Sequence, residues 1–227
     1  MRCRLVGSEM CIRDSIWEEH LEIVNRNIKS GQTSCYIFEV GNVFYKNSEF
    51  IQEEILNGAI FGNKKFGEWV NSGKDNDLNY YEARGKLKEA LSSLNIKVDD
   101  KPTDSIDFLH PGRTAKLFIE GKDAGYFGEI HPKLILDKTA LKKVYLFSIN
   151  VANLLGASTR KNKWIPIYKQ YPIVPKMERD INFIFSKEHL ISEITSEIRK
   201  TGKNLLEDVN LIDVFEDTKF GDDHISY

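Results

Sequence analysis

The chain has 227 residues, a net charge of −2 and a hydrophobic fraction of 41%, values typical of a globular protein with one large or two modest domains. No apolar run approaches the roughly 20 residues of a membrane-spanning helix, and the net charge gives no global sign of nucleic-acid binding. The three cysteines, Cys3, Cys11 and Cys35, lack zinc-ligand spacing and favour a reducing cytoplasm over a disulfide framework.

The first fifteen residues differ from the rest of the chain. They hold two of the three cysteines and show neither helical nor strand periodicity. A secretory signal would need an apolar core of about 7–15 residues, which this stretch lacks. It is similar to translated adapter sequence, and the alternative is a disordered native tail. We therefore expect residues 1–15 to carry no function and the natural polypeptide to begin upstream.

The next eighty residues predict a helix, two strands and a second helix. Apolar residues recur at helical spacing over residues 16–28. The β-forming run over residues 35–44 and the apolar run over residues 55–61 predict two neighbouring strands. A helix over residues 80–94 is predicted to bury one face on a sheet, because four apolar residues lie at i, i+3, i+4 and i+7. These residues are Leu87, Ala90, Leu91 and Leu94.

A β-hairpin is the clearest local prediction in the chain. Two strands are predicted over residues 116–120 and 123–130, and the loop between them begins with Gly121, as a type II′ turn over Gly121 and Lys122 requires. A further strand is predicted over residues 143–149. Because strands and helices mix without the regular alternation of a doubly wound fold, we predict an α+β fold with a mainly antiparallel sheet.

A change in composition marks a second domain. Three prolines between residues 159 and 179 predict an extended linker, because proline lacks the backbone donor of regular structure. Ser186 is expected to cap a helix that Gly202 ends. The buried stripe of this helix is predicted to be Ile191, Ile194 and Ile198. Strands are predicted around the helix, at residues 180–185, 209–215 and 224–227.

The order β-α-β-β is the first half of a ferredoxin-like split β-α-β unit, without its second helix and last strand. A half-built sheet would expose an unpaired edge, so we expect the chain to be cut. The predicted domains are a segment without function, an α+β module, a basic linker and an incomplete ferredoxin-like domain, at residues 1–15, 16–158, 159–168 and 169–227.

No catalytic or metal-binding constellation stands out in the sequence. The five histidines lack metal-ligand spacing, and no serine, cysteine or lysine has a recognisable activating partner. His110 and His131 each precede a proline. One interpretation is a paired polar site at the ends of neighbouring strands. The other, which we favour, is a pair of turn residues whose imidazoles bond to the backbone.

The linker has the composition of an RNA-binding segment. Between residues 159 and 179, six basic residues accompany the single acid Glu178, and aromatic residues are interleaved with them. Cations neutralise phosphates and aromatic rings stack on unpaired bases. The alternative is a solvated basic linker whose aromatic residues pack on a neighbouring domain. The residues in question are Arg160, Lys161, Lys163, Lys169, Lys176 and Arg179, with Trp164, Tyr168 and Tyr171.

Three stretches together resemble the bacterial phenylalanyl-tRNA synthetase β subunit. The first, Ile37-Phe38-Glu39-Val40-Gly41-Asn42-Val43-Phe44 preceded by Asn25-Arg26-Asn27, is similar to a strand of the family's class II-like module. The second joins His110-Pro111-Gly112-Arg113-Thr114-Ala115 to Gly125-Tyr126-Phe127-Gly128-Glu129-Ile130-His131-Pro132. The third joins Tyr171-Pro172 and Arg179-Asp180-Ile181 to residues 209–215, and is similar to the start of the family's ferredoxin-fold anticodon-binding domain.

The resemblance implies a place in an α2β2 enzyme that joins phenylalanine to tRNA(Phe) with ATP and Mg²⁺ in the cytoplasm, away from membranes. The α subunit would hold the catalytic site, and this part of the β subunit would contact the α subunit and the anticodon side of the tRNA. We therefore expect no catalytic residue, no metal ligand and no bound cofactor in this chain. The expected tRNA-binding residues are Lys169, Tyr171, Lys176 and Arg179.

The same resemblance implies a structural role for the paired His-Pro motifs, which comprise His110, Pro111, Gly112, Gly128, His131 and Pro132. A hypothesis from a different class is also open. The chain would then be a free-standing regulatory protein whose ferredoxin-like half binds a small molecule.

Overall fold

The computed structural model describes residues 16–47, 49–64, 76–134, 143–160, 164–165, 168, 170, 173–217, 219 and 223–227. The chain divides into two compact units, residues 1–167 and residues 168–227. The predicted non-native segment 1–15 and half of the predicted linker 159–168 (residues 161–163 and 166–167) lie outside the described residues, and the predicted domain boundaries stay predictions.

The first helix, α1 (Trp17–Lys29), agrees with the prediction for residues 16–28. Two glutamates lie in its first turn and two basic residues in its last turn, which complements the helix dipole. Val24 is fully buried against the sheet, and His20 is buried with its Nδ1 3.0 Å from the carbonyl oxygen of Ile16. The periodic apolar stripe therefore covers one face of the sheet.

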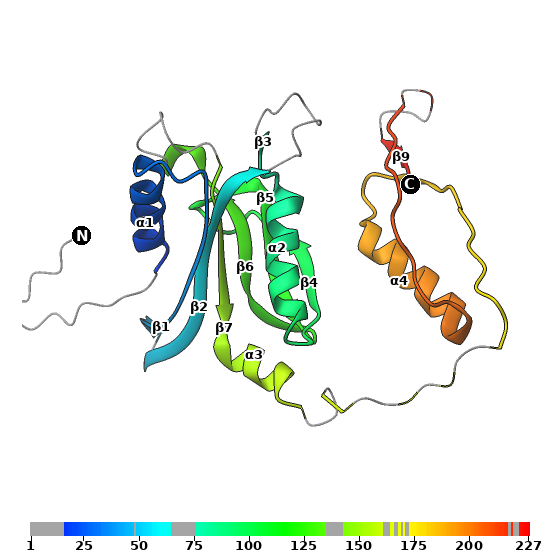
Figure 1. Ribbon diagram of the computed structural model, residues 1–227, viewed down its shortest axis with the longest axis horizontal. Helices are drawn as coiled ribbons and strands as arrows, with labels where there is room; N and C mark the ends of the chain where they lie inside the picture. Colours follow the sequence, from blue (N-terminus) through cyan, green and yellow to red (C-terminus); the bar gives the residue numbers. More distant parts are fainter. Residues whose placement is uncertain are drawn as a thin grey trace, which may run out of the picture. The chain divides into compact units, whose positions relative to one another are not determined.

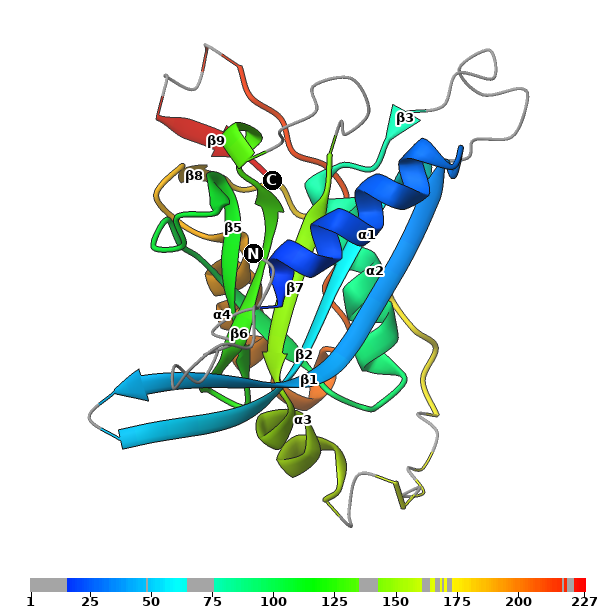
Figure 2. The same cartoon turned by 90° about the vertical axis from the view of Figure 1, so that its left-hand side faces the viewer.

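The two predicted strands form a long antiparallel ribbon. Strand β1 (Ser34–Asn47) pairs along its whole length with β2 (Glu49–Lys64), and the last two residues of β2 pair with the short β3 (Asn76–Asp77). Because β7 pairs only with the part of β2 from Ile55 to Ile60, the other end of the ribbon extends past the sheet. Figure 2 shows this end of β1 and β2 projecting from the rest of the unit.

The second helix, α2 (Tyr80–Ser92), begins with a capping box between Asn79 and Glu82. Leu87 and Leu91 are buried as predicted, whereas Ala90 and Leu94 are exposed. The predicted face was therefore wrong in part. The helix ends before Leu94, and its sheet-facing line continues toward the N-terminus through Ala83 and Arg84, both of which are buried.

The remaining elements of the first unit complete the sheet. They are β4 (Val98–Pro102), β5 (Leu109–Ile119), β6 (Lys122–Ile130), the 3₁₀ turn η2 (Pro132–Leu134), β7 (Tyr145–Asn150) and α3 (Val151–Ser158). The strand order is β1-β2-β7-β6-β5-β4, and every neighbouring pair is antiparallel. The α+β class with an antiparallel sheet is confirmed.

The predicted hairpin exists, but its turn differs from the prediction. Ile119 pairs with Lys122, so the loop residues are Glu120 and Gly121. Both have positive φ, 53° and 80°, which is the requirement of a type I′ turn. The prediction of a type II′ turn over Gly121 and Lys122 was therefore wrong by one residue. Strand pairing decided the register, and the glycine occupies the second loop position.

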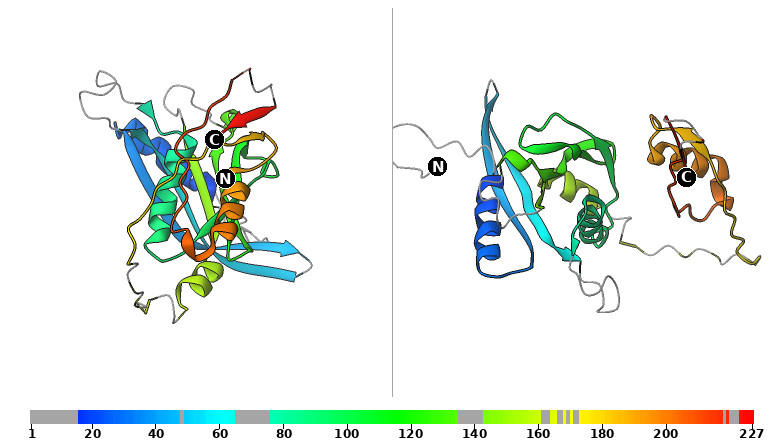
Figure 3. Two further views of the ribbon diagram at one scale, coloured as in Figure 1. Left: turned by 90° about the vertical axis from the view of Figure 1, so that its right-hand side faces the viewer. Right: turned by 90° about the horizontal axis from the view of Figure 1, so that it is seen from above.

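Helices cover both faces of the sheet. One hydrophobic cluster lies between α1 and the sheet and includes Val24 and Leu146. The other lies between the opposite face and helices α2 and α3, and includes Leu87, Phe127 and Leu154. Figure 1 and the right panel of Figure 3 show α1 and α2 on opposite sides of the strands. This three-layer arrangement fixes the ends of β5 and β6, where the paired His-Pro motifs lie.

The second unit contains β8 (Ile184–Ser186), α4 (Ile191–Gly202), the 3₁₀ turn η4 (Lys203–Leu205) and β9 (His224–Ser226). The helix ends at Gly202 as predicted. Its N-cap is Leu190 without a side-chain bond, so the predicted cap at Ser186 was wrong. The predicted isoleucine stripe is only half-buried.

The topology of the second unit follows the predicted order, with shorter strands. β8 pairs antiparallel with β9. The predicted strand over residues 209–215 is reduced to one bridge, in which the N–H groups of Phe215 and Ser226 each donate to the other's carbonyl oxygen at 2.8 and 2.9 Å. Ser226 therefore has β8 on one side and Phe215 on the other. No helix in the described part of the chain is long and apolar enough to cross a membrane.

Candidate functional site

The paired His-Pro motifs meet at a bulge in strand β5. Leu109 pairs with Ile130 and Thr114 with Gly128, so the four residues from His110 to Arg113 lie opposite the single residue Glu129. A bulge accommodates Pro111, which has no N–H to give to a ladder. The extra residues leave the plane of the sheet, and this brings the two motifs together at the same end of the hairpin.

Both imidazoles accept hydrogen bonds from the backbone. The Gly112 N–H donates to His110 Nδ1 at 3.1 Å, and the Lys133 N–H donates to His131 Nδ1 at 3.2 Å. The two rings also lie side by side, with centroids 6.4 Å apart and planes tilted by 27°. The geometry therefore contains the backbone bonds of one interpretation and the pairing of the other, and the structural role assigned to these residues stays a prediction.

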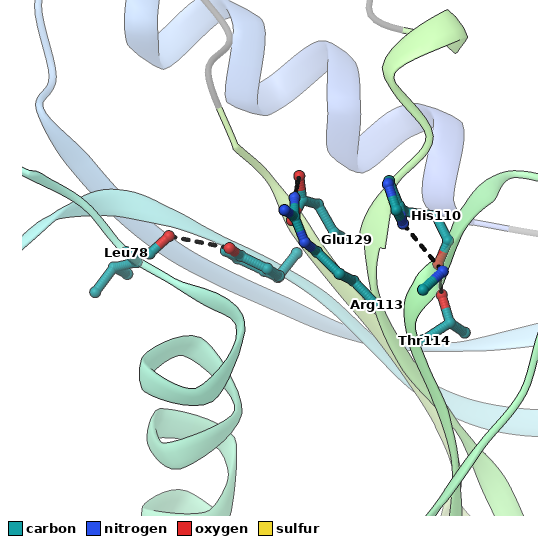
Figure 4. A network of polar contacts seen from close by, with 7 residues as sticks. Leu78, His110, Arg113, Thr114 and Glu129 are labelled. Carbon is teal, nitrogen blue, oxygen red and sulfur yellow. Dashed lines mark hydrogen bonds and ion pairs between the residues drawn. The ribbon is translucent and has the colours of Figure 1, made fainter. Parts of the chain in front are cut away.

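A partly buried ion pair lies at the bulge, between an exposed arginine and a buried glutamate. Arg113 Nη1 donates to both carboxylate oxygens of Glu129, at 3.1 and 2.9 Å, and the Glu129 side chain is only 7% exposed. Nearby, the Tyr145 hydroxyl donates to the carbonyl oxygen of Leu78 at 3.0 Å. Burial, and then the negative charge of Glu129, raise the pKa of Tyr145. Figure 4 shows Arg113 and Glu129 pointing toward one another, with His110 and Thr114 close by.

Two contacts hold the backbone of the bulge. The Thr114 hydroxyl donates to the carbonyl oxygen of His110 at 2.7 Å. A β-carbon at Gly128 would lie 2.6 Å from Thr114 Oγ1 and 2.8 Å from Leu109 Cδ1, so only glycine fits beneath this bond. More than one contact therefore holds the two motifs in position.

The sequence by itself suggested no role for Thr114 or for the Arg113–Glu129 pair. Arg113 lies outside the strand predicted over residues 116–120, so the predicted hairpin did not indicate the pair. The hydroxyl bond had no signal either, since it depends on the length of the bulge.

The predicted tRNA-binding residues are partly described. Lys169 and Tyr171 lie outside the described residues. Lys176 lies 2.9 Å from Glu178, and this contact raises the pKa of Lys176 and lowers that of Glu178. Arg179 is exposed and makes no ion pair with Asp180 in the part of the chain that the structure describes. Of the four, the structure describes Lys176 and Arg179, and the assignment of all four to tRNA binding stays a prediction.

The neighbouring basic and aromatic residues that the structure describes are exposed as well. Arg160 pairs with Glu120, the Trp164 indole N–H donates to the carbonyl oxygen of Ser158 at 2.6 Å, and Tyr168 is exposed. Among the described residues, no group of three or more His, Cys, Asp or Glu could hold a metal ion. The described residues thus supply hydrogen-bond donors, cations and exposed rings, which are groups that can contact phosphates and bases.

A helix-covered antiparallel sheet followed by a small β-α-β unit defines a two-part α+β protein. Residues 8–151 match the family model described as "Phenylalanyl tRNA synthetase beta chain CLM domain", and residues 172–227 match "Ferredoxin-fold anticodon binding domain". The first match covers more than half of the chain, so the chain belongs to the phenylalanyl-tRNA synthetase β-chain CLM-domain family. The match begins at residue 8, inside the segment 1–15. The non-native origin of that segment stays a prediction.

Curated relatives agree with the family assignment. The chain is 83% identical over 217 residues, 96% of its length, to the phenylalanine–tRNA ligase β subunit of Prochlorococcus marinus strain MIT 9312. It is 66% identical, again over 96% of its length, to the β subunit of Prochlorococcus marinus subsp. pastoris. The chain spans 27% and 26% of these two relatives.

One solved structure shows a weaker likeness. It is a pyrrolysyl tRNA synthetase of Desulfitobacterium hafniense, with a TM-score of 0.41 and 13% identity over 63% of this chain and 50% of that chain. A likeness at this level does not establish a shared fold.

Proposed function

We propose that the chain is part of the β subunit of a phenylalanine–tRNA ligase, where it contacts the α subunit and the anticodon side of the tRNA and performs no catalysis. The observation that carries the proposal is the 83% identity to a phenylalanine–tRNA ligase β subunit over 96% of the chain. Family membership favours this function over that of a free-standing regulatory protein.

The proposal assigns the substrates phenylalanine, ATP and tRNA(Phe) to the whole enzyme, together with Mg²⁺, an α2β2 assembly and a cytoplasmic location. We place no step of the reaction on the described residues, because the family resemblance assigns the catalytic site to the α subunit. Their contribution is binding and positioning. Within the second unit we assign the RNA contacts to Lys169, Tyr171, Lys176 and Arg179.

The contact with the α subunit is assigned to β1. Tyr36, Phe38 and Val40 alternate along this strand, so their side chains lie on one face, and they are 54%, 75% and 51% exposed. Three large apolar side chains in a row on an edge strand are typical of a protein–protein interface. Because Phe38 is mostly exposed, its replacement should spare the fold.

A chimera tests the proposal. Residues 16–227 replace the matching segment of the MIT 9312 β subunit, and the chimera is co-expressed with the α subunit of that organism. We expect co-purification of the two subunits and phenylalanylation of tRNA(Phe). Failure of the subunits to co-purify would count against the ligase function.

Two variants of the chimera make the test specific. Phe38→Asp should abolish co-purification, because an unpaired carboxylate would be buried in the interface. Tyr81→Asp is the matched control, since Tyr81 is 81% exposed on α2 and is not assigned to any interface. Equal co-purification of both variants would refute the assignment to β1 while leaving the ligase function untouched.

A further inference from the structure

The two imidazoles at the β5 bulge have a defined tautomer. A backbone N–H can only donate, so the bonds from Gly112 and Lys133 require an unprotonated Nδ1 on both His110 and His131. The hydrogen of each neutral ring is then on Nε2. The pair therefore presents two N–H donors and no acceptor.

The two donors are held in place before any ligand arrives. Thr114 fixes the carbonyl of His110, and the His131 N–H donates to the carbonyl oxygen of Phe108 at 2.9 Å. Both rings are half-buried, and they lie 6.4 Å apart between centroids. In the described part of the chain neither Nε2 has a hydrogen-bond partner, so both donors are available to a ligand.

This arrangement selects an oxygen anion over a metal ion. A metal-bound imidazole gives one nitrogen to the metal and donates from the other, whereas here Nδ1 accepts and Nε2 carries the hydrogen. Two adjacent N–H donors suit the oxygens of a single phosphate group. Lys133, which is exposed, follows His131 by two residues and adds a cation beside the pair in sequence, whereas the charge of Arg113 is already paired with Glu129.

We propose that His110 and His131 form a two-donor site for a phosphate group of the RNA backbone. The proposal rests on the function proposed above, and adds a second RNA contact in the first unit, separate from the anticodon-binding unit. A phosphodiester is favoured over a protein carboxylate because it lies on a polyanion, which the exposed Lys133, two residues after His131, attracts. Free inorganic phosphate shares the same chemistry, and the experiment distinguishes the two sources.

The test uses the complete β subunit with its α subunit, and two double variants. An aspartate can accept the N–H of the residue two positions later, as Asp123 does from Gly125 at 3.1 Å. His110→Asp with His131→Asp therefore keeps both turns and replaces the outward donors with carboxylates. His110→Asn with His131→Asn is the matched control, since asparagine keeps the turn acceptor and an N–H donor.

The measurements are tRNA(Phe) affinity over a salt series and thermal unfolding of each protein. We expect the Asn pair to bind within about threefold of wild type and the Asp pair to bind at least roughly tenfold more weakly at low salt. The difference should shrink as salt rises, because added ions screen the repulsion between carboxylate and phosphate. Equal unfolding temperatures would show that the loss is one of binding.

The outcomes separate this proposal from the function on which it rests. A wild-type enzyme that does not bind tRNA(Phe) would overturn both. Equal tRNA affinity of wild type and the Asp pair would overturn the phosphate site alone, and so would loss of α-subunit co-purification at unchanged tRNA affinity, which indicates a protein contact. Saturable shifts of the imidazole resonances with inorganic phosphate, without an effect of the Asp pair on tRNA, would assign the site to a small anion instead. Nitrogen-15 spectra that show a protonated Nδ1 would remove its basis.

Discussion

Gly125 is the position at which the sheet should tolerate a side chain least. Its φ is 138°, a conformation that L-residues rarely adopt, and it pairs with Leu117 on β5 and Ile149 on β7. A β-carbon there would lie 1.9 Å from the carbonyl oxygen of Ser148, whereas ordinary contact begins at 3.4 Å. In Gly125→Ala the strands must therefore separate by about 1.5 Å, the difference between these two distances.

The expected loss of stability follows from two contributions. Backbone strain at a positive φ costs about 1–3 kcal/mol, and the displacement weakens one or two ladder hydrogen bonds at about 1 kcal/mol each. Together these predict a destabilisation of about 3–5 kcal/mol. Gly85→Ala is the matched control, because Gly85 is an exposed residue of α2 with nothing within 4 Å of the added methyl group, and alanine should stabilise that helix by about 0.5–1 kcal/mol.

Hydrogen exchange followed by mass spectrometry is the assay, with urea unfolding as a second measurement. Gly125→Ala should lower the protection of peptides covering β6 and β7 and shift the unfolding midpoint to lower urea, whereas Gly85→Ala should shift it slightly upward. If Gly125→Ala leaves protection and midpoint at their wild-type values, the inferred approach of β6 and β7 is wrong.

Three more predictions concern other parts of the chain. Arg84, which is buried, bonds to both carboxylate oxygens of Asp100 at 2.7 and 2.6 Å, so Asp100→Asn should destabilise by about 2–3 kcal/mol, and a double-mutant cycle with Arg84→Met should reveal coupling between them. Burial, and then the charge of Asp100, raise the pKa of Tyr80 to about 12, so its contribution to stability is complete below pH 10 and is lost as pH rises to about 12. Tyr80→Phe should therefore flatten the alkaline fall in unfolding free energy, and an unchanged slope would contradict this. In the complete enzyme, Lys169→Ala with Lys176→Ala should weaken tRNA binding about tenfold and reduce its salt dependence, and an unchanged salt slope would assign both lysines to a solvated linker.

Local patterns were sufficient for the elements whose residues interact with near neighbours in sequence. The apolar period over residues 16–28 gives α1, and the β-forming runs give the β1–β2 ribbon, because helical and strand periodicities fix which side chains share a face. Motif order was sufficient for the family, since the paired His-Pro motifs and the stretches on either side of them resemble it without reference to any contact. The α+β class follows from the mixture of these elements.

Tertiary structure decided the register of the hairpin and everything that depends on it. Gly121 at a loop is evident in the sequence, but pairing between Ile119 and Lys122 placed the turn one residue earlier than local chemistry predicts. The same pairing, with the bulge from His110 to Arg113, brings two histidines 21 positions apart in the chain to a centroid distance of 6.4 Å. No periodicity encodes that distance, because it depends on how many residues leave the ladder.

In the second unit, strand-forming composition alone did not produce the predicted strand. The predicted strand over residues 209–215 has the right β-forming composition, yet only Phe215 bridges to β9. Strand propensity is realised where a neighbouring strand and a hydrophobic face are present to stabilise it. The sequence by itself therefore determined the family and the types of element, whereas packing determined which side chains meet, and the availability of both Nε2–H donors at the bulge could be read only from their contacts.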